Sequence, residues 1–119
     1  MAAWNSGGAT PKSKESGEPI ELWEILVPCQ YNDRKPVTTR HHKEWDKYVR
    51  KLAGGLTIMK PAKGVWVHEE ALFEERMIPV RIACSEKVIK QVMTFTLSHY
   101  RQIKVMAYRV STYCIIMDK

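Results

Sequence analysis

The sequence has no long hydrophobic run. No apolar stretch approaches the roughly 18 to 20 residues needed to cross a bilayer, and the first residues lack the basic-then-apolar order of a signal peptide. Cysteine is scarce as well: Cys29, Cys84 and Cys114 are widely separated and form no CxxC pair, so neither a disulfide framework nor a zinc-finger pattern is present. These absences predict a cytoplasmic protein with reduced thiols and no membrane contact.

The signatures of several common enzyme classes are also missing. The sequence contains no GxGxxG, GxxxxGK[ST], GxSxG or HExxH motif, so dinucleotide binding, P-loop chemistry, serine hydrolysis and zinc proteolysis have no support. His41 and His42 are adjacent, and neighbouring side chains on a helix point about 100° apart, so these two cannot bind one metal ion together. We therefore expect no metal site and no cofactor.

What is present suits one globular domain. The chain has 119 residues, of which 45% are hydrophobic and 27% charged, the balance of a protein with a packed core. Residues 1–19 contain almost nothing to bury except Trp4, and we expect a disordered tail there. The domain is expected to span residues 20–119.

Hydrophobic periodicity and turn residues predict the order β-α-β-β-α-β. The expected strands cover 22–27, 56–59 with 65–67, 75–83 and 104–110, and the expected helices begin at Thr39 and Ser85, with 113–117 as an extra strand piece. Pro79 favours an edge strand or a bulge. This order fits a ferredoxin-like α+β sandwich, an antiparallel sheet with two helices on one face.

Such a sheet leaves its second face uncovered. The expected strands supply large side chains that this face could expose: Trp23, Trp66, Met77, Met106 and Tyr108. They are too many for a face open to water, so we expect a homo-oligomer, a dimer or a trimer, to cover it.

The formal net charge of +6 is concentrated in one segment. Residues 31–63 hold nine basic and three acidic residues, and the segment therefore carries +6 by itself. Such a segment can attract nucleic acid or another anionic partner, or it can be a solvated helix face. A nucleic-acid-binding module that uses residues 34–63, with weak binding, is thus one alternative.

Acidic residues gather around the expected hairpin between the second and third strands. Glu74 and Glu75 lie there, and Glu75 shares its strand face with Arg81. A charged hairpin is one interpretation. In the other, Glu75 lies with Trp66 and Tyr108 as a carboxylate beside aromatic rings, an arrangement that attracts a cation.

Several short motifs carry a resemblance over residues 22–117. They are Gly55-Leu56-Thr57-Ile58, Gly64-Val65-Trp66, Glu74-Glu75, Val80-Arg81 with Cys84, and Tyr100-x-Gln102-x-x-Val105-x-x-Tyr108. In these the chain resembles small ferredoxin-like bacterial and phage proteins of uncharacterised function. It is similar, more loosely, to the phage-encoded S-adenosylmethionine lyases once called hydrolases. Trp66 stands where those lyases have a functional Tyr, and the Glu pair lies two residues further from the Val-Arg strand.

The resemblance implies an oligomer whose pockets between subunits bind a small cationic metabolite such as S-adenosylmethionine. It implies Glu75 and Trp66 as catalytic residues, with Glu74, Tyr108, Gln102 and Arg81 binding substrate. The products would be methylthioadenosine and homoserine lactone, formed when the substrate's own carboxylate displaces the leaving group, so the enzyme supplies orientation and electrostatics. The alternative to this enzyme is a phage or bacterial protein that acts through its surface alone.

Overall fold

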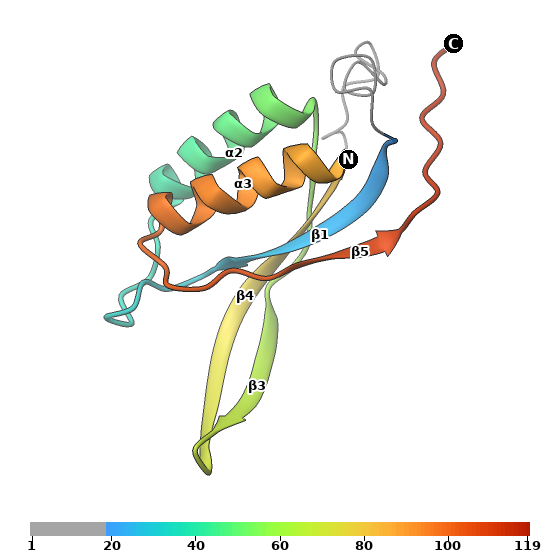
Figure 1. The fold of residues 1–119 in the computed structure, drawn as a ribbon. Coiled ribbons are helices and arrows are strands. Elements are labelled where there is room, and N and C mark those ends of the chain that lie inside the picture. Colours follow the sequence, from blue (N-terminus) through green and yellow to red (C-terminus); the bar gives the residue numbers. More distant parts are fainter. Residues whose placement is uncertain (1–18) are drawn as a thin grey trace.

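A five-stranded antiparallel sheet with both helices on one face forms the fold in the computed structural model, which describes residues 19–119 (Figure 1). The elements are β1 (Glu21–Pro28), α2 (Thr39–Ala53), β2 (Thr57–Ile58), β3 (Ala62–His68), β4 (Ala71–Cys84), α3 (Glu86–His99) and β5 (Ala107–Ser111). The strand order is β2-β4-β1-β5, with β3 also paired to β4. The predicted ferredoxin-like arrangement is confirmed. The expected tail falls almost wholly on residues 1–18, which lie outside the described part.

Both helices begin at a residue whose side chain caps the first turn, and α2 also ends at a glycine. The hydroxyl of Thr38, one residue before the expected cap, accepts from the His41 amide at 3.2 Å, and that of Ser85 accepts from Val88. Gly54 ends α2 with φ of 96°, a conformation that favours glycine. Local sequence signals therefore set the start of each helix and the end of α2 to within about one residue.

The core lies between the helices and the covered face of the sheet. Alternate residues of β1 and β4 face the helices, and the buried side chains include Ile25, Val27, Trp45, Val49, Val80, Ile82, Ile89 and Val92. Tyr100, fully buried just after α3, closes one end of this core. The packing fixes β1 and the inner half of β4 against both helices.

The position of Pro79 corrects one alternative from the sequence. β4 is a central strand, paired with β1 on one side and with β2 and β3 on the other. Pro79 lies opposite the break between β2 and β3, where its carbonyl accepts from the Met59 amide at 2.9 Å. The missing proline N–H therefore falls at an irregularity of the neighbouring strand rather than at an edge.

Two further predictions are wrong. Trp23 does not lie on the uncovered face: it is buried on the helix side, and its Nε1 donates to the Cys84 carbonyl at 3.2 Å. The C-terminal piece at 113–117 continues beyond β5 without pairing as a strand. No helix among the described residues is long and apolar enough to span a membrane.

Candidate functional site

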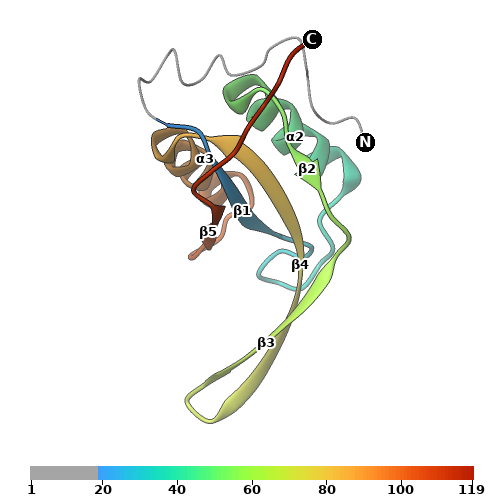
Figure 2. The same ribbon diagram turned by 90° about the vertical axis from the view of Figure 1, so that its right-hand side faces the viewer.

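The hairpin of β3 and β4 projects well beyond the helices (Figure 2). Its turn, Glu69-Glu70, has positive φ at both residues, which allows a tight two-residue connection. The side chains of residues 71–76 are all exposed, whereas those of 79–84 are nearly all buried. The hairpin therefore stands on a rigid base, and the candidate site lies at the junction.

The loop after β1 meets the hairpin at this junction. The Cys29 amide donates to the Arg76 carbonyl at 3.2 Å, which joins the loop to β4. Asn32 Nδ2 donates to the Arg101 carbonyl at 2.9 Å, which joins the same loop to the segment after α3 that carries Gln102. Three segments distant in sequence are thus held together.

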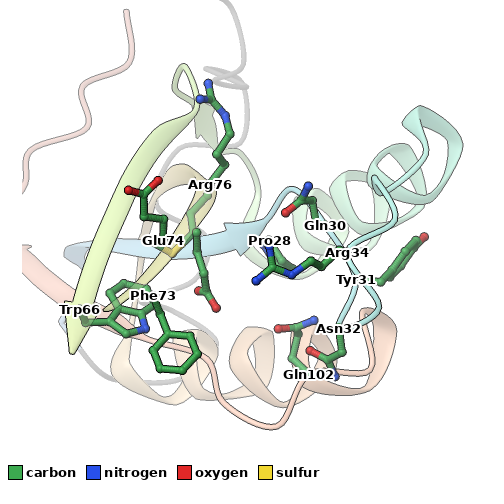
Figure 3. Close-up of a pocket in the computed structure, with 12 residues that line it drawn as sticks. Pro28, Gln30, Tyr31, Asn32, Arg34, Trp66, Phe73, Glu74, Arg76 and Gln102 are labelled. Atoms are coloured by element: carbon green, nitrogen blue, oxygen red, sulfur yellow. The ribbon is translucent and has the colours of Figure 1, made fainter. Parts of the chain in front are cut away.

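A pocket of about 190 Å³ lies between these segments (Figure 3). The hairpin contributes Trp66, Phe73, Glu74, Glu75, Arg76 and Met77, and the rest of the lining is Pro28, Gln30, Tyr31, Asn32, Arg34 and Gln102. Four of the six site residues expected from the sequence therefore line one pocket: Trp66, Glu74, Glu75 and Gln102.

Trp66 lies next to Glu75 because of Gly64. In the strand register Glu75 is opposite Gly64, and Trp66 is opposite Phe73, so all four share one face of the hairpin. A Cβ added to Gly64 would lie 2.6 Å from the Trp66 ring and 2.5 Å from the Met77 methyl group. The indole therefore folds back over Gly64, beside the Glu75 side chain.

The charges of the pocket are mixed. Glu75 forms no ion pair within residues 19–119, and Arg34 brings a basic residue to the same lining. Glu74 and Arg76 alternate with Glu75 along β4, and Figure 3 shows both extending away from Trp66 and Phe73. Glu75 is thus the carboxylate best placed against the aromatic rings.

Arg81 and Tyr108, the other two expected site residues, belong to a separate cluster. Both bind Glu24, which is only 8% exposed on the sheet face opposite the helices. Arg81 Nε donates to Glu24 Oε1 at 2.9 Å, and the Tyr108 hydroxyl donates to Oε2. Neither residue lines the pocket beside Glu75.

The environment of Glu24 keeps it ionised. Burial acts to raise the pKa of its carboxyl, but the hydrogen bonds from Tyr108 and Arg81 and the charge of Arg81 outweigh burial and leave the pKa below its ordinary value. The same hydrogen bond raises the pKa of Tyr108. The cluster is a satisfied polar network in the middle of the uncovered sheet face.

Sequence reasoning missed Glu24, Tyr31, Asn32 and Arg34. Glu24 interrupts the apolar run of β1, and a charged residue inside such a run is a signal that it has buried partners. The loop residues carry no comparable signal, because only tertiary hydrogen bonds bring them to the hairpin.

The pocket can bind and orient a ligand without offering an evident nucleophile. The Glu75 carboxylate and the ring face of Trp66 favour a cation, and the guanidinium group of Arg34 favours a carboxylate. A ligand with both kinds of group, such as an amino acid that bears a further positive charge, matches this lining.

Comparisons with known proteins agree on the fold alone. Neither a family model nor a curated protein sequence matches the chain significantly. A phage SAM lyase, solved in complex with S-methyl-5′-thioadenosine, is similar with a TM-score of 0.60 and 15% identity, covering 81% of this chain and 84% of the lyase. The CutA1 of Oryza sativa has a TM-score of 0.59 and 12% identity, covering 79% of this chain and 80% of its own. The divalent cation tolerance protein CutA1 of Thermus thermophilus has a TM-score of 0.58 and 10% identity, and the match covers 76% of this chain and 82% of that protein.

Proposed function

We propose that this chain is a small homo-oligomeric enzyme that binds S-adenosylmethionine in the pocket at the base of the hairpin and cleaves it as a lyase. The observation that carries the proposal is the pair formed by Glu75 and Trp66, a carboxylate and a ring on one hairpin face, in a pocket that Arg34 also lines. The similarity in fold to a phage SAM lyase supports it.

The chemistry of this substrate suits the lining. S-adenosylmethionine carries a sulfonium, an ammonium and a carboxylate, so Glu75 and Trp66 would stabilise positive charge while Arg34 would hold the carboxylate. In the reaction the substrate's carboxylate oxygen bonds to its own γ-carbon as the carbon–sulfur bond breaks. The electron pair leaves with sulfur, giving methylthioadenosine and homoserine lactone, and no enzyme nucleophile is needed.

The size of the pocket supports an oligomer. Its volume of about 190 Å³ is below the roughly 300–1,000 Å³ typical of small-molecule sites. The hairpin exposes Trp66 and Phe73 on the pocket face and Val65, Val67 and Leu72 on its other face. A second copy of the chain would cover such apolar groups and complete the pocket. The three cysteines are free, in keeping with a reducing compartment such as the cytoplasm.

The test is to incubate the purified protein with S-adenosylmethionine and measure methylthioadenosine by chromatography. We expect product from the wild type, and a ten- to hundredfold lower rate from Glu75→Gln, which removes the charge but keeps the shape (about 1–3 kcal/mol). Glu70→Gln is the matched control, since it makes the same change at the tip of the same hairpin, and it should retain the wild-type rate. An absence of product at millimolar substrate would contradict the proposal.

The nucleic-acid alternative uses a different surface. The basic residues of its central part, Lys43, Lys47, Arg50 and Lys51, are exposed on α2, and Arg50 is paired with Asp46 at 2.8 Å. Charge alone predicts weak binding whose log affinity falls linearly with log salt concentration. A submicromolar affinity for RNA that survives about 200 mM salt would favour this alternative instead.

A further inference from the structure

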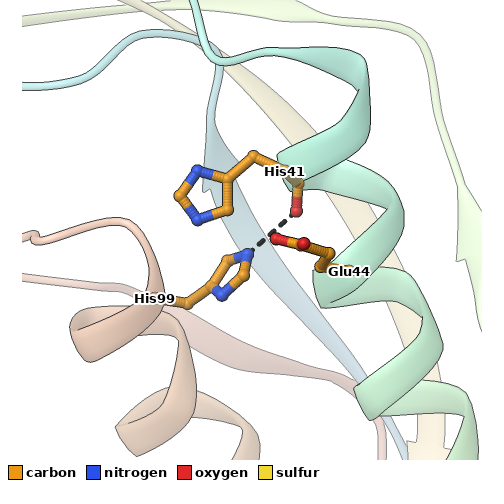
Figure 4. A group of neighbouring side chains, drawn as sticks. All are labelled: His41, Glu44 and His99. Atoms are coloured by element: carbon orange, nitrogen blue, oxygen red, sulfur yellow. Dashed lines mark hydrogen bonds between the residues drawn. The ribbon is translucent and has the colours of Figure 1, made fainter.

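A second group of side chains lies between the ends of the two helices, away from the hairpin. His41 and Glu44 are on the first turns of α2, and His99 is the last residue of α3 (Figure 4). One donor atom from each lies within 4.8 Å of the other two. Along the sequence His41 has only His42 as a neighbouring histidine, whereas the fold brings it to a histidine 58 residues away.

We propose that His41, Glu44 and His99 bind a divalent transition-metal ion of the Zn²⁺ class. Two imidazoles and one carboxylate are a ligand set that Zn²⁺ accepts. The i, i+3 spacing puts His41 and Glu44 on one face of α2. Zn²⁺ ligands at 2.0–2.1 Å in tetrahedral geometry stand about 3.3 Å apart, so the donor atoms have to approach one another by up to about 1.5 Å to close the site.

Hydrogen bonds already orient both rings. His99 Nε2 donates to the His41 carbonyl at 2.8 Å, the dashed line in Figure 4, and His41 Nδ1 is hydrogen-bonded to the Tyr31 hydroxyl. His41 thus keeps Nε2 outside its bond, whereas the His99 nitrogen nearest Glu44 in Figure 4 is Nε2 itself, so a metal ion bound there would replace the bond to the His41 carbonyl. Metal-binding histidines usually hold their second nitrogen in such a bond, which fixes the tautomer and the ring orientation.

Packing around the rings limits their movement further. The His99 ring stacks on Phe95 at 5.0 Å and meets the Tyr100 ring edge-on at 4.9 Å. Glu44 is more accessible, with a side chain 56% exposed and only a 3.8 Å ion pair to the exposed Arg40, a contact that contributes little. One nitrogen from each ring and an adaptable carboxylate therefore lie close together.

Solvent can reach this site from the side of Glu44, whose side chain is more than half exposed. Water can therefore occupy the fourth coordination position, as it does in zinc sites with three protein ligands. A cavity of about 520 Å³ lies beside His41 as well, but neither Glu44 nor His99 lines it.

The experiment is calorimetric titration of the untagged full-length protein with ZnCl₂ in the absence of S-adenosylmethionine, so that its result is independent of the proposed lyase activity. We expect one ion per chain, a raised melting temperature with Zn²⁺, and no comparable binding of Mg²⁺, which prefers oxygen ligands. Co²⁺ should give the visible absorption bands of a nitrogen- and oxygen-ligated ion.

Variants locate the ion. Glu44→Gln and His41→Gln should each weaken Zn²⁺ binding at least tenfold, whereas Glu70→Gln and His68→Gln on the hairpin should leave it unchanged. Glu44 is exposed, so its variant decides the matter if His41→Gln does not fold. No binding at millimolar Zn²⁺, or equal binding by wild type and Glu44→Gln, would overturn the proposal.

Discussion

The two halves of β4 obey the same strand geometry in opposite surroundings. In the inner half Val80 and Ile82 are no more than 1% exposed, because α2 and α3 cover them. In the outer half Leu72 is 64% exposed, and so is its neighbour across the hairpin, Val67, at 66%. Alternation makes both halves strands, but only the inner half has a second layer within the chain.

This difference separates the half of β4 that stabilises the fold from the half that is available to contact other molecules. The inner half contributes to the core that stabilises the chain, while the outer half presents apolar and charged groups that contribute little to that core. The candidate pocket lies where the halves meet, with Glu75 and Met77 in its lining.

Substitutions in the exposed hairpin should have their largest effect on the oligomeric state. If a second copy covers the hairpin, wild-type protein forms a homo-oligomer at micromolar concentration, and the double variant Val67→Lys with Leu72→Glu becomes monomeric while keeping its fold, since the two new charges face each other across the strands. Light scattering and circular dichroism measure both properties. A wild type that is purely monomeric would contradict this account of the hairpin.

Truncation in the core should cost more stability than truncation in the hairpin. Ile82→Ala should lower the free energy of unfolding by about 2–5 kcal/mol because it leaves a cavity among fully buried neighbours. Leu72→Ala, made in a background kept monomeric by Val67→Lys, should change it by less than about 0.5 kcal/mol. Urea denaturation compares them, and equal costs would show that the hairpin packs within the chain.

The stability that the Glu24 cluster contributes should depend on pH. The pKa of Glu24 is lower in the folded state than in the unfolded state. The contribution of Glu24 to the free energy of unfolding is therefore fully present above the unfolded-state pKa and is lost as the pH falls through the folded-state pKa. Glu24→Gln should therefore cost about 1–3 kcal/mol at pH 7, and the gap from wild type should narrow below about pH 4. Urea denaturation of the wild type and Glu24→Gln at pH 7 and below about pH 4 tests this prediction. A difference in stability that is the same at both pH values would show that the charge of Glu24 does not stabilise the fold.

The sequence predicts much of the fold because its signals are local. Ser85 and Gly54-Gly55 mark helix boundaries, and alternation marks the strands. The face of Trp23 was not predictable in the same way, because β1 carries large apolar residues on both faces. The place of Pro79 was not predictable from the sequence either, because it depends on the break between β2 and β3 on the neighbouring side of β4.

The candidate site was predictable in part for the same reason. Trp66, Glu74 and Glu75 lie on one hairpin, so their proximity follows from strand pairing. The partners of Glu24 are 57 and 84 residues away in sequence. Likewise His99 reaches His41 only through the packing of α3 against α2, which periodicity does not specify.

Calorimetric titration with S-adenosylmethionine tests the central claim, that the junction of the hairpin and the core is a ligand site, most directly. The account predicts saturable binding by the wild type, unchanged binding by Glu70→Gln, and ten- to hundredfold weaker binding by a folded Glu75→Gln. Equal affinity of the wild type and Glu75→Gln, or no binding at millimolar ligand, would contradict it.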